Sequence, residues 1–437
     1  MSKLDVQRPP RIAFVTQWFP PEPGAPEIYF NLARGLSDLG CSVRVITAVP
    51  NYPLGRTFPG YSPWRAMVED IRGLTALRVP VVPSHGDSAV GRVSNYASFA
   101  ASAAIWGRQW LSTSDVNILV SSPATVDAVG AAYRKLCGSE YVLLLQDIWP
   151  ETVFATGFIE EGQARRVAEI ALTGYVNGTV RGASRVLVNS PSLVDALVAR
   201  GAAPGRLGVL HNWVDEAVFE PGADAGHLRL ILGLAPTDRV FLYSGNLGFA
   251  QGLDQWIEAF RVGLVPAGAH LVIQGDGAAR KELRRLAQGA PNVHFLSQKD
   301  TAAQAVEVMR GADWLVVSLN DTDLSAVTMP SKVPSSLAMG MPVVATVTGD
   351  AARALDESGA GIVAAPAGPS AVASLVVSAL AESPERRAER GVAGRRYYER
   401  TMSRAHGLDV LRATVDACTE GALTALGAEP PSLTASG

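Results

Sequence analysis

The sequence predicts an α/β protein made of two separate doubly wound domains, each built on a parallel sheet. Short apolar runs alternate with helical stretches along the whole chain, which is the pattern of strands joined by crossover helices. The chain has 437 residues, which is long for one domain and suits two of about 200 residues each. The same alternation begins again after a polar stretch at residues 220–226, and this predicts the second domain.

The first half opens with an apolar run at residues 11–17, a loop rich in proline and glycine, and a helix at 26–39. Runs that are apolar on both faces predict strands buried inside a parallel sheet. Such runs in the first half lie at residues 11–17, 43–48, 141–147, 185–189 and 207–211.

In the second half, strands are predicted at residues 240–244, 270–274, 314–318 and 342–346, and helices at 253–262, 281–288 and 333–339. After residue 383 the pattern is helical to about residue 423. We therefore predict domains at residues 1–219 and 220–395, a final helix at 396–425 and a flexible tail at 426–437.

Composition excludes several classes of protein. The net charge of −3 gives no reason to expect a nucleic-acid partner. The three cysteines have no zinc-binding spacing, and no run reaches 18 apolar residues, so neither a zinc site nor a membrane-spanning helix is expected. The N-terminus is polar and lacks the apolar core of a signal peptide, which predicts a cytoplasmic protein.

Ligands of open parallel sheets bind beyond the carboxyl ends of the strands, so the loops after strands are the candidate sites. Two such loops in the second half are rich in glycine, which lets the backbone approach a phosphate, although a strand-ending glycine can equally mark a tight turn. The candidate donor-binding residues in these loops are Gly245, Asn246, Leu247, Gly248, Gln251, Gly275, Asp276 and Gly277.

The segment Pro330, Ser331 and Lys332 lies ahead of the predicted helix at 333–339. Ser331 is a plausible N-cap. A lysine in the first turn opposes the helix dipole unless an anion binds there, so Lys332 is a candidate partner of a diphosphate. The alternative is a solvated surface lysine.

The first half offers two further candidates. The rigid loop with Glu22, Gly24 and Ala25 lies between the first strand and helix, where it either contacts an acceptor or phosphate or acts as a stiff connector. Asp147 follows five apolar residues and therefore lies at the carboxyl edge of the sheet. It either binds a sugar hydroxyl or assists proton transfer, or it caps the next helix.

Two further patterns are less specific. Asp321 and Asp323 resemble a metal-binding DxD pair, but no third ligand is evident, so turn formation or hydroxyl recognition is the better interpretation. The stretch at residues 96–110 is largely uncharged and contains Trp106, Arg108 and Trp110. It fits either a helix docked on a membrane surface or a core helix.

Six ordered segments then carry a family resemblance. They are Phe-Pro-Pro-Glu-Pro-Gly-Ala at 19–25, Pro-Asn-Tyr-Pro-Leu-Gly at 50–55, Gln-Asp-Ile-Trp-Pro-Glu at 146–151, Asn-Trp-Val-Asp at 212–215, Ser-Gly-Asn-Leu-Gly at 244–248 with Gln-Gly-Leu at 251–253, and Pro-Ser-Lys at 330–332. With these segments the chain resembles the retaining GT-B glycosyltransferases of family 4, in the bacterial surface-polysaccharide branch.

The resemblance implies two Rossmann-like domains facing a cleft, with the nucleotide held mainly by the second and the acceptor by the first, and C-terminal helices crossing back to the first. It also implies transfer without a metal ion or other cofactor. The family's usual phosphate-binding Arg and Lys fall at Asn246 and Gln251, and its paired glutamates at Val327 and Ser335. We infer that Lys332 supplies the missing positive charge, while the residue that binds the ribose stays unassigned.

The sequence thus predicts a retaining, metal-independent glycosyltransferase. Lys332 and Asp147 are its candidate catalytic residues, and UDP is the first choice of donor nucleotide, with GDP second. The acceptor is a glycan, a polyprenol-linked glycan or a small molecule, with peripheral contact to the inner face of the membrane as an option. A sugar-nucleotide 2-epimerase and a non-catalytic sugar-nucleotide binding protein are the alternatives.

Overall fold

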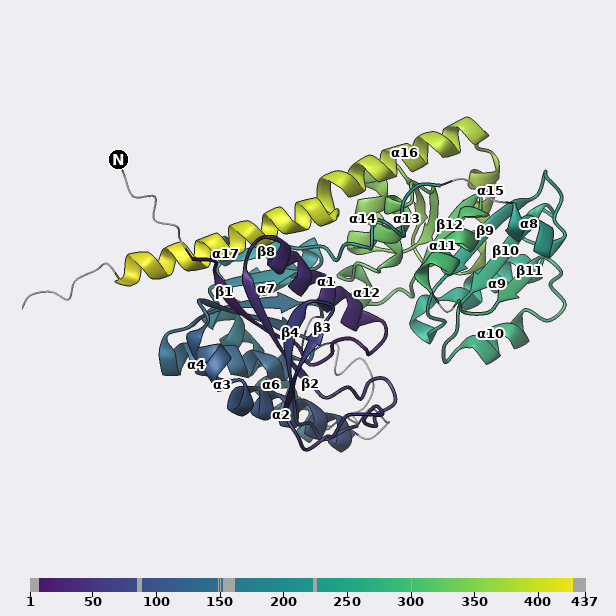
Figure 1. The fold of residues 1–437 in the computed structure, drawn as a ribbon. Helices are drawn as coiled ribbons and strands as arrows, with labels where there is room; N and C mark the ends of the chain where they lie inside the picture. Colours follow the sequence, from purple (N-terminus) through teal and green to yellow (C-terminus); the bar gives the residue numbers. More distant parts are fainter. Residues whose placement is uncertain are drawn as a thin grey trace, which may run out of the picture. The chain divides into compact units, whose positions relative to one another are not determined.

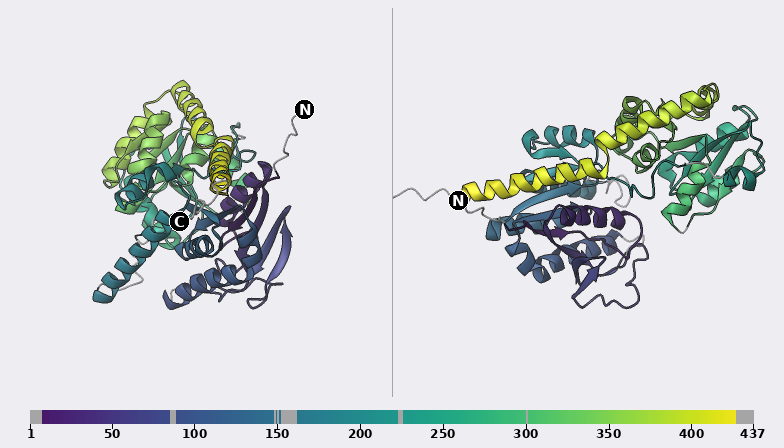
Figure 2. Two further views of the ribbon diagram at one scale, coloured as in Figure 1. Left: turned by 90° about the vertical axis from the view of Figure 1, so that its left-hand side faces the viewer. Right: turned by 45° about the horizontal axis from the view of Figure 1, so that its top comes forward.

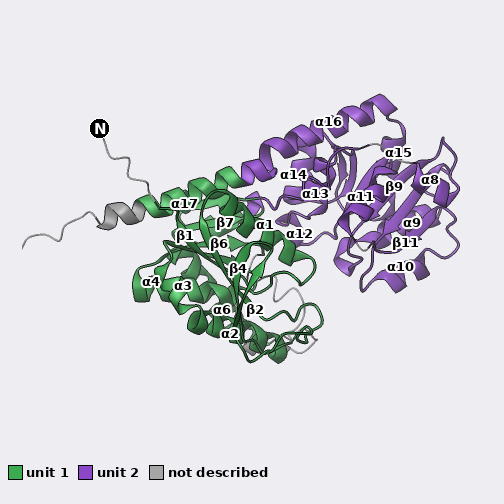
Figure 3. Cartoon of the chain, in the orientation of Figure 1, with its two compact units in different colours: residues 1–189, 193–210, 408–437 green, residues 190–192, 211–407 purple. Residues whose placement is uncertain are grey.

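The computed structural model describes residues 8–84, 89–147, 149, 151, 162–222, 226–299 and 301–426 (Figure 1). Contacts between residues divide the chain into two compact units, drawn in two colours in Figure 3. Unit 1 comprises Met1–Asn189, Leu193–Leu210 and Leu408–Gly437, and unit 2 comprises Ser190–Ser192 and His211–Gly407. The sequence-based boundaries at 219/220 and 395/396 stay predictions, and the predicted tail at 426–437 lies almost wholly outside the described residues.

Unit 1 contains one sheet of eight strands in the order β3-β4-β2-β1-β5-β6-β7-β8. All neighbouring strands are parallel except β3 and β4, which form an antiparallel pair at one edge. The strands are β1 (Arg11–Val15), β2 (Ser42–Ala48), β3 (Met67–Ile71), β4 (Leu74–Val79), β5 (Val116–Ser121), β6 (Glu140–Leu145), β7 (Arg185–Val188) and β8 (Leu207–Val209).

Helices cover both faces of this sheet (Figure 1). The described helices are α1 (Ala25–Asp38), α2 (Ala89–Trp106), α3 (Arg108–Thr113), α4 (Asp127–Cys137), α6 (Gln163–Gly182) and α7 (Pro191–Ala199). Helices α2, α4 and α6 pack beside one another on one face, and α1 lies on the other. Because every residue of β5 and nearly every residue of β6 is buried, the apolar sequence of these strands is explained by helices on both sides.

Unit 2 contains six parallel strands in the order β11-β10-β9-β12-β13-β14. They are β9 (Arg239–Ser244), β10 (Ala269–Gln274), β11 (Val293–Leu296), β12 (Trp314–Ser318), β13 (Val343–Thr346) and β14 (Gly361–Ala364). This order reverses direction between β9 and β12, and the crevice at such a switch point is where doubly wound sheets bind ligands.

The helices of unit 2 are α8 (His227–Leu232), α9 (Leu253–Arg261), α10 (Arg280–Leu286), α11 (Ala302–Arg310), α12 (Asp323–Ala326), α13 (Lys332–Ala338), α14 (Gly349–Ser358), α15 (Pro369–Leu380) and α16 (Pro384–Thr401). Helix α9 shows why these segments are helical. Its buried residues Leu253, Trp256, Ile257 and Phe260 recur every three or four positions and form one apolar face against the sheet.

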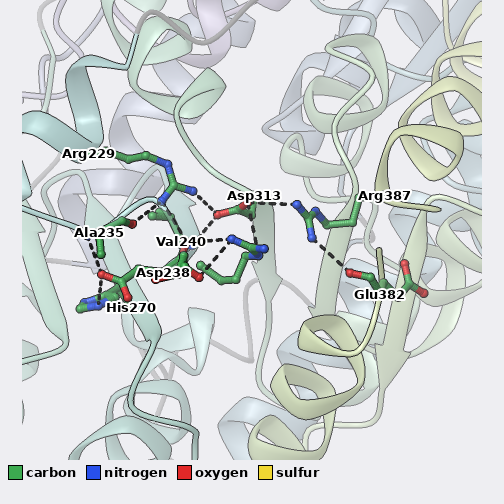
Figure 4. A network of polar contacts seen from close by, with 10 residues as sticks. Arg229, Ala235, Asp238, Val240, His270, Asp313, Glu382 and Arg387 are labelled. Atoms are coloured by element: carbon green, nitrogen blue, oxygen red, sulfur yellow. Dashed lines mark hydrogen bonds and ion pairs between the residues drawn. The ribbon is translucent and has the colours of Figure 1, made fainter. Parts of the chain in front are cut away.

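A network of charges centred on Asp313 holds the amino ends of the unit 2 strands (Figure 4). The Asp313 carboxylate accepts hydrogen bonds from Arg229 at 2.6 Å, from Arg387 at 3.4 Å and from the Val240 N–H at 2.8 Å. These donors come from α8, α16 and β9. One half-buried carboxylate therefore ties three elements that are far apart in the sequence.

The final helix, α17 (Arg404–Leu426), belongs to unit 1 from Leu408 onward. Leu411, Val415 and Cys418 on this helix are buried. Burial raises the pKa of Cys418 to about 11, and the charges of Glu140 and Arg185 also act on it, so Cys418 lies near the amino ends of β6 and β7, which begin with these two residues. Figure 2 draws α17 in yellow, at the C-terminal end of the described chain. The carboxyl ends of β6 and β7, where ligands are expected, point away from this helix.

The two predicted parallel-sheet α/β domains are thus confirmed. Sequence reasoning missed β3, β4, β5, β11 and β14, of which β3 is exposed and the last two are short and half-buried. The predicted helix after residue 383 is two helices, with a break at residues 402 and 403. The stretch at 96–110 is likewise divided between α2 and α3 at the buried Gly107, where a Cβ would lie 2.6 Å from the Ile46 side chain.

Candidate functional site

The two glycine-rich loops of unit 2 lie against each other at the carboxyl ends of β9 and β10. The Leu247 N–H donates to the Asp276 carbonyl at 2.8 Å, and the Ala279 N–H donates to the Leu247 carbonyl at 2.8 Å. Gly275 has a φ of +144°, and a Cβ there would collide with the Gly245 carbonyl oxygen. Glycine is therefore required for the two loops to approach this closely.

This packing leaves backbone donors at the rim of the site. Among the described residues, neither the Asn246 N–H nor the Gly248 N–H has a protein acceptor, whereas the Leu247 N–H between them is bonded. Asp276 is exposed and accepts from its neighbouring Gly277 N–H at 2.8 Å. The loops therefore offer N–H groups to an anion at the edge where the sheet order reverses.

Lys332 brings the positive charge to these loops. Its Nζ donates to the Gln251 Oε1 at 2.9 Å and lies 4.7 Å from the centre of the Tyr243 ring. A Cβ on Gly245 would lie 3.0 Å from the Lys332 Cε, so the amine reaches the β9 loop itself. The structure thus brings two of the predicted donor-binding residues, Gly245 and Gln251, together around one amine.

The electrostatic setting of Lys332 is unusual for a lysine. The side chain is half-buried, and burial lowers its pKa to about 8. No carboxylate in the described parts of the chain forms an ion pair with it. A cation that is held by an amide and an aromatic ring is incompletely neutralised, and a bound anion would supply the missing charge.

Tyr243 is a member of this cluster that sequence reasoning missed. Its hydroxyl lies 2.7 Å from the Asn246 carbonyl oxygen and 2.9 Å from the Gln251 Oε1. Burial raises its pKa, so the phenol keeps its proton and positions the amide that meets Lys332. The available signal was a tyrosine at the penultimate position of a buried strand, two residues before the first glycine of the loop.

The remaining candidates on this side lie at the starts of α12 and α13. Ser331 occupies the N-cap position of α13, but its side chain makes no capping hydrogen bond, and Pro330 precedes it in the loop. Thr322, between Asp321 and Asp323, caps α12 by accepting from the Ser325 N–H at 3.1 Å.

At the two positions where the wider family carries glutamates, this chain has Ser335 and Val327. The Ser335 hydroxyl is buried and donates to the Lys332 carbonyl at 3.1 Å within α13. Val327 follows α12 as its C-cap. The structure therefore leaves ribose recognition without an assigned side chain.

In unit 1, the buried Glu22 carboxylate joins the loop after β1 to the loop after β2. Its Oε1 accepts from the N–H groups of Asn51 at 2.8 Å and Tyr52 at 2.7 Å, and its Oε2 accepts from the Phe19 N–H at 3.1 Å. Burial raises the pKa of Glu22 to about 6, and these three N–H donors oppose that rise. Gly24 and Ala25 are exposed, with Gly24 at φ +84° directly before α1.

Asp147 lies where predicted, just beyond the carboxyl end of β6. Its side chain is exposed, and its Oδ2 accepts a hydrogen bond from the Ser122 hydroxyl, which follows β5, at 3.2 Å. Burial of the carboxyl group raises the pKa of Asp147 and the Ser122 hydrogen bond opposes that rise, and the free oxygen lone pairs of this carboxylate can accept hydrogen bonds from a ligand. Within the described residues, no group of three or more metal-ligating side chains is found.

Two family descriptions match this chain in the order of its units. "Glycosyl transferase 4-like domain" matches residues 24–213, and "Glycosyl transferases group 1" matches residues 238–382. The chain is 30% identical over 323 residues to WcaI of Escherichia coli K12, which is named as a colanic acid biosynthesis glycosyl transferase; the match covers 72% of this chain and 78% of WcaI. The chain belongs to glycosyltransferase family 4.

Solved structures agree with the fold of this glycosyltransferase. Sucrose-phosphate synthase from Thermosynechococcus elongatus has a TM-score of 0.71 at 18% identity, with 96% of this chain and 100% of that one covered. HepE from Anabaena, solved with UDP, has a TM-score of 0.68 at 16% identity, with 93% and 100% covered. The GT-B fold that the resemblance implied is therefore confirmed.

Proposed function

We propose that this glycosyltransferase moves a sugar from a nucleoside-diphosphate sugar to a hydroxyl group, with UDP as the nucleotide and without a metal ion. The observation that carries the proposal is the Lys332 amine, held against the two interlocked glycine loops of unit 2 without a carboxylate partner among the described residues. A diphosphate is the anion that such loops accommodate.

The chemistry follows from the charge on the leaving group. As the bond between the sugar C1 and the diphosphate oxygen breaks, negative charge grows on the diphosphate. The Lys332 ammonium and the N–H groups of Asn246 and Gly248 stabilise that charge, which is electrostatic catalysis. The acceptor oxygen bonds to C1 and its proton passes to the leaving phosphate, so the reaction needs no strong protein base.

Retention of configuration at C1 is part of the proposal, since the leaving phosphate takes the acceptor proton on the face that it departs from. UDP is the first choice because HepE was solved with UDP and with UDP-glucose. By its similarity to WcaI, we assign the reaction to polysaccharide biosynthesis in the cytoplasm, where nucleotide sugars are made.

A thermal-shift panel with UDP, GDP and dTDP, each with and without EDTA, tests the donor. A stabilisation by UDP that persists in EDTA is expected, since ligand binding raises stability with the logarithm of ligand excess. Lys332→Gln should lose this shift while the unfolding temperature of the free protein stays unchanged. An unshifted wild-type protein, or an epimerised sugar nucleotide formed without acceptor, would refute the transferase proposal.

We also propose peripheral contact of unit 1 with an anionic membrane surface through α2. One face of α2 is exposed and apolar, with Val90, Val93 and Ile105 each more than 60% exposed. Trp106 is exposed at its end, and Arg108 begins the next helix. Neither α2 nor α3 contains an acidic residue. An apolar face flanked by tryptophan and arginine suits the interface of an anionic bilayer. No described helix is long and apolar enough to cross a bilayer.

Vesicle sedimentation tests this contact. Ile105→Glu should reduce binding to vesicles containing phosphatidylglycerol, and Val392→Glu on α16 is the matched control, since Val392 is also exposed. Equal sedimentation of both variants with the wild-type protein would exclude α2 as the docking surface.

A further inference from the structure

Four aromatic rings gather beyond the carboxyl ends of the unit 1 strands. The ring centres of Trp18 and Tyr52 are 5.7 Å apart, those of Trp18 and Tyr96 are 6.2 Å apart, and those of Tyr96 and Trp149 are 6.4 Å apart. Trp18 follows β1, Tyr52 follows β2, Tyr96 belongs to α2 and Trp149 follows β6. All four are half-exposed, so their faces remain partly open to solvent.

A buried chain of amides lies beneath three of these rings. The Gln17 Nε2 donates to the Asn95 Oδ1 at 2.5 Å, and the Asn95 Nδ2 donates to the Asn51 Oδ1 at 3.2 Å. Gln17, Asn95 and Asn51 are each at most 1% exposed. Each precedes one ring of the cluster in the sequence, namely Trp18, Tyr96 and Tyr52.

This amide chain fixes the rings before any ligand arrives. Buried amides cost free energy unless they are hydrogen-bonded, so the bonds among Gln17, Asn95 and Asn51 favour one arrangement of these side chains. The buried Gln17 Oε1 has no hydrogen-bond partner among the described residues. Glu22 supports the same arrangement, because its carboxylate accepts from the N–H groups of Asn51 and Tyr52. Glu22, which sequence reasoning placed in a candidate acceptor or phosphate loop, therefore helps to hold the backbone at Tyr52.

Asp147 lies at the same cluster. Burial is the main cause that raises the pKa of Tyr96, the Arg92 charge opposes the rise, and the Asp147 and Tyr52 charges add to it. The Asp147 carboxylate accepts a hydrogen bond from the Ser122 hydroxyl. Open aromatic faces beside a carboxylate fit a ligand with one apolar face and several hydroxyl groups.

A pyranose ring has this chemistry, since its axial C–H bonds form an apolar face and its equatorial hydroxyls point outward. We propose that Trp18, Tyr52, Tyr96 and Trp149 form the acceptor subsite, and that the acceptor carries an uncharged pyranose that stacks on these rings and donates a hydroxyl hydrogen bond to Asp147. This inference rests on the proposed transferase function and names its acceptor class.

Saturation-transfer NMR of the full-length protein tests the subsite, with the methyl glycosides of glucose, galactose, mannose and N-acetylglucosamine as probes and UDP present. We expect saturation of the ring C–H protons of at least one glycoside. Trp18→Leu and Tyr96→Leu should each weaken that binding about tenfold. Trp18→Phe should retain most of the glycoside binding, because phenylalanine also presents a flat aromatic face. Trp64→Leu is the matched control, since Trp64 lies in the same unit and is 71% exposed but outside the cluster.

Absence of saturation for all four glycosides, or equal binding by the wild-type protein and both leucine variants, would overturn the subsite. The UDP thermal shift of the same samples separates the two proposals. If UDP fails to bind while a glycoside binds through the rings, the donor proposal fails and the subsite stands. If Trp18→Leu removes both glycoside binding and the UDP shift, the loss reflects misfolding of that variant. The subsite is then tested by glycoside binding to Trp18→Phe and Tyr96→Leu.

Discussion

The low pKa of Lys332 makes nucleotide binding depend on pH in a range where few other groups titrate. Burial holds this pKa at about 8 in the free protein. The amine is then about nine-tenths protonated at pH 7 and about one-tenth protonated at pH 9. A bound diphosphate favours the ammonium form and raises the pKa of Lys332, so binding takes up a proton above pH 8.

The magnitude follows from these fractions. If only the ammonium form binds, UDP affinity should fall about tenfold between pH 7 and pH 9, which is about 1.4 kcal/mol. The phosphate groups are already ionised across this range, since their second pKa is about 6. Titration calorimetry in buffers of different ionisation enthalpy would measure both the affinity and the proton uptake.

Two variants separate Lys332 from other titrating groups. Lys332→Arg keeps its charge at both pH values, so its UDP affinity should not change with pH. Lys332→Gln should bind weakly at both. A tenfold fall in affinity that persists in Lys332→Gln, or a wild-type affinity that is equal at pH 7 and pH 9, would refute the role of this amine.

Three further predictions concern the scaffold. Burial raises the pKa of Asp127 to about 7, so the folded protein keeps a proton that the unfolded chain releases near pH 4. The free energy of unfolding should therefore fall by up to about 4 kcal/mol as pH rises from about 4 to about 7. Asp127→Asn should flatten the profile of unfolding temperature against pH. Gly275→Ala should abolish the UDP thermal shift, because the new Cβ meets the Gly245 carbonyl, whereas Gly174→Ala, in open space, should retain it. Asp313→Ala should lower the free energy of unfolding, measured in urea, by about 3–5 kcal/mol, because it leaves the Arg229 and Arg387 charges without their carboxylate partner. A decrease below about 1 kcal/mol would contradict the role of this network.

The sequence predicted the sheets well because long apolar runs and punctuating glycines are local signals. The same reasoning placed Asp147 at the edge of the sheet and grouped Gly245 with Gly275. It could not find the contact of Lys332 with Gln251 and Tyr243, because residues 81 positions apart meet only through the sheet order. Nor could it separate the buried Glu22 from an exposed loop carboxylate, since the burial of Glu22 depends on a second loop at residues 51 and 52.

The aromatic cluster was missed for a related reason. Trp18, Tyr52, Tyr96 and Trp149 come from four separate segments, and each ring taken alone reads as a core residue. Three of them follow residues of one buried amide chain, which becomes visible only when the strands are in register. Sequence periodicity reports which face of an element is buried, but not which side chains meet at the end of a sheet.

Helix α17 gives unit 1 a property that its order in the chain conceals. Unit 1 is completed by residues from Leu408 onward, which are made after the whole of unit 2. During synthesis the first 210 residues therefore emerge with the site that Leu411, Val415 and Cys418 will occupy still uncovered. Unit 1 can reach its final stability only when the last helix has left the ribosome, so a chain that ends before α17 should have an unstable unit 1 even though unit 2 is nearly complete.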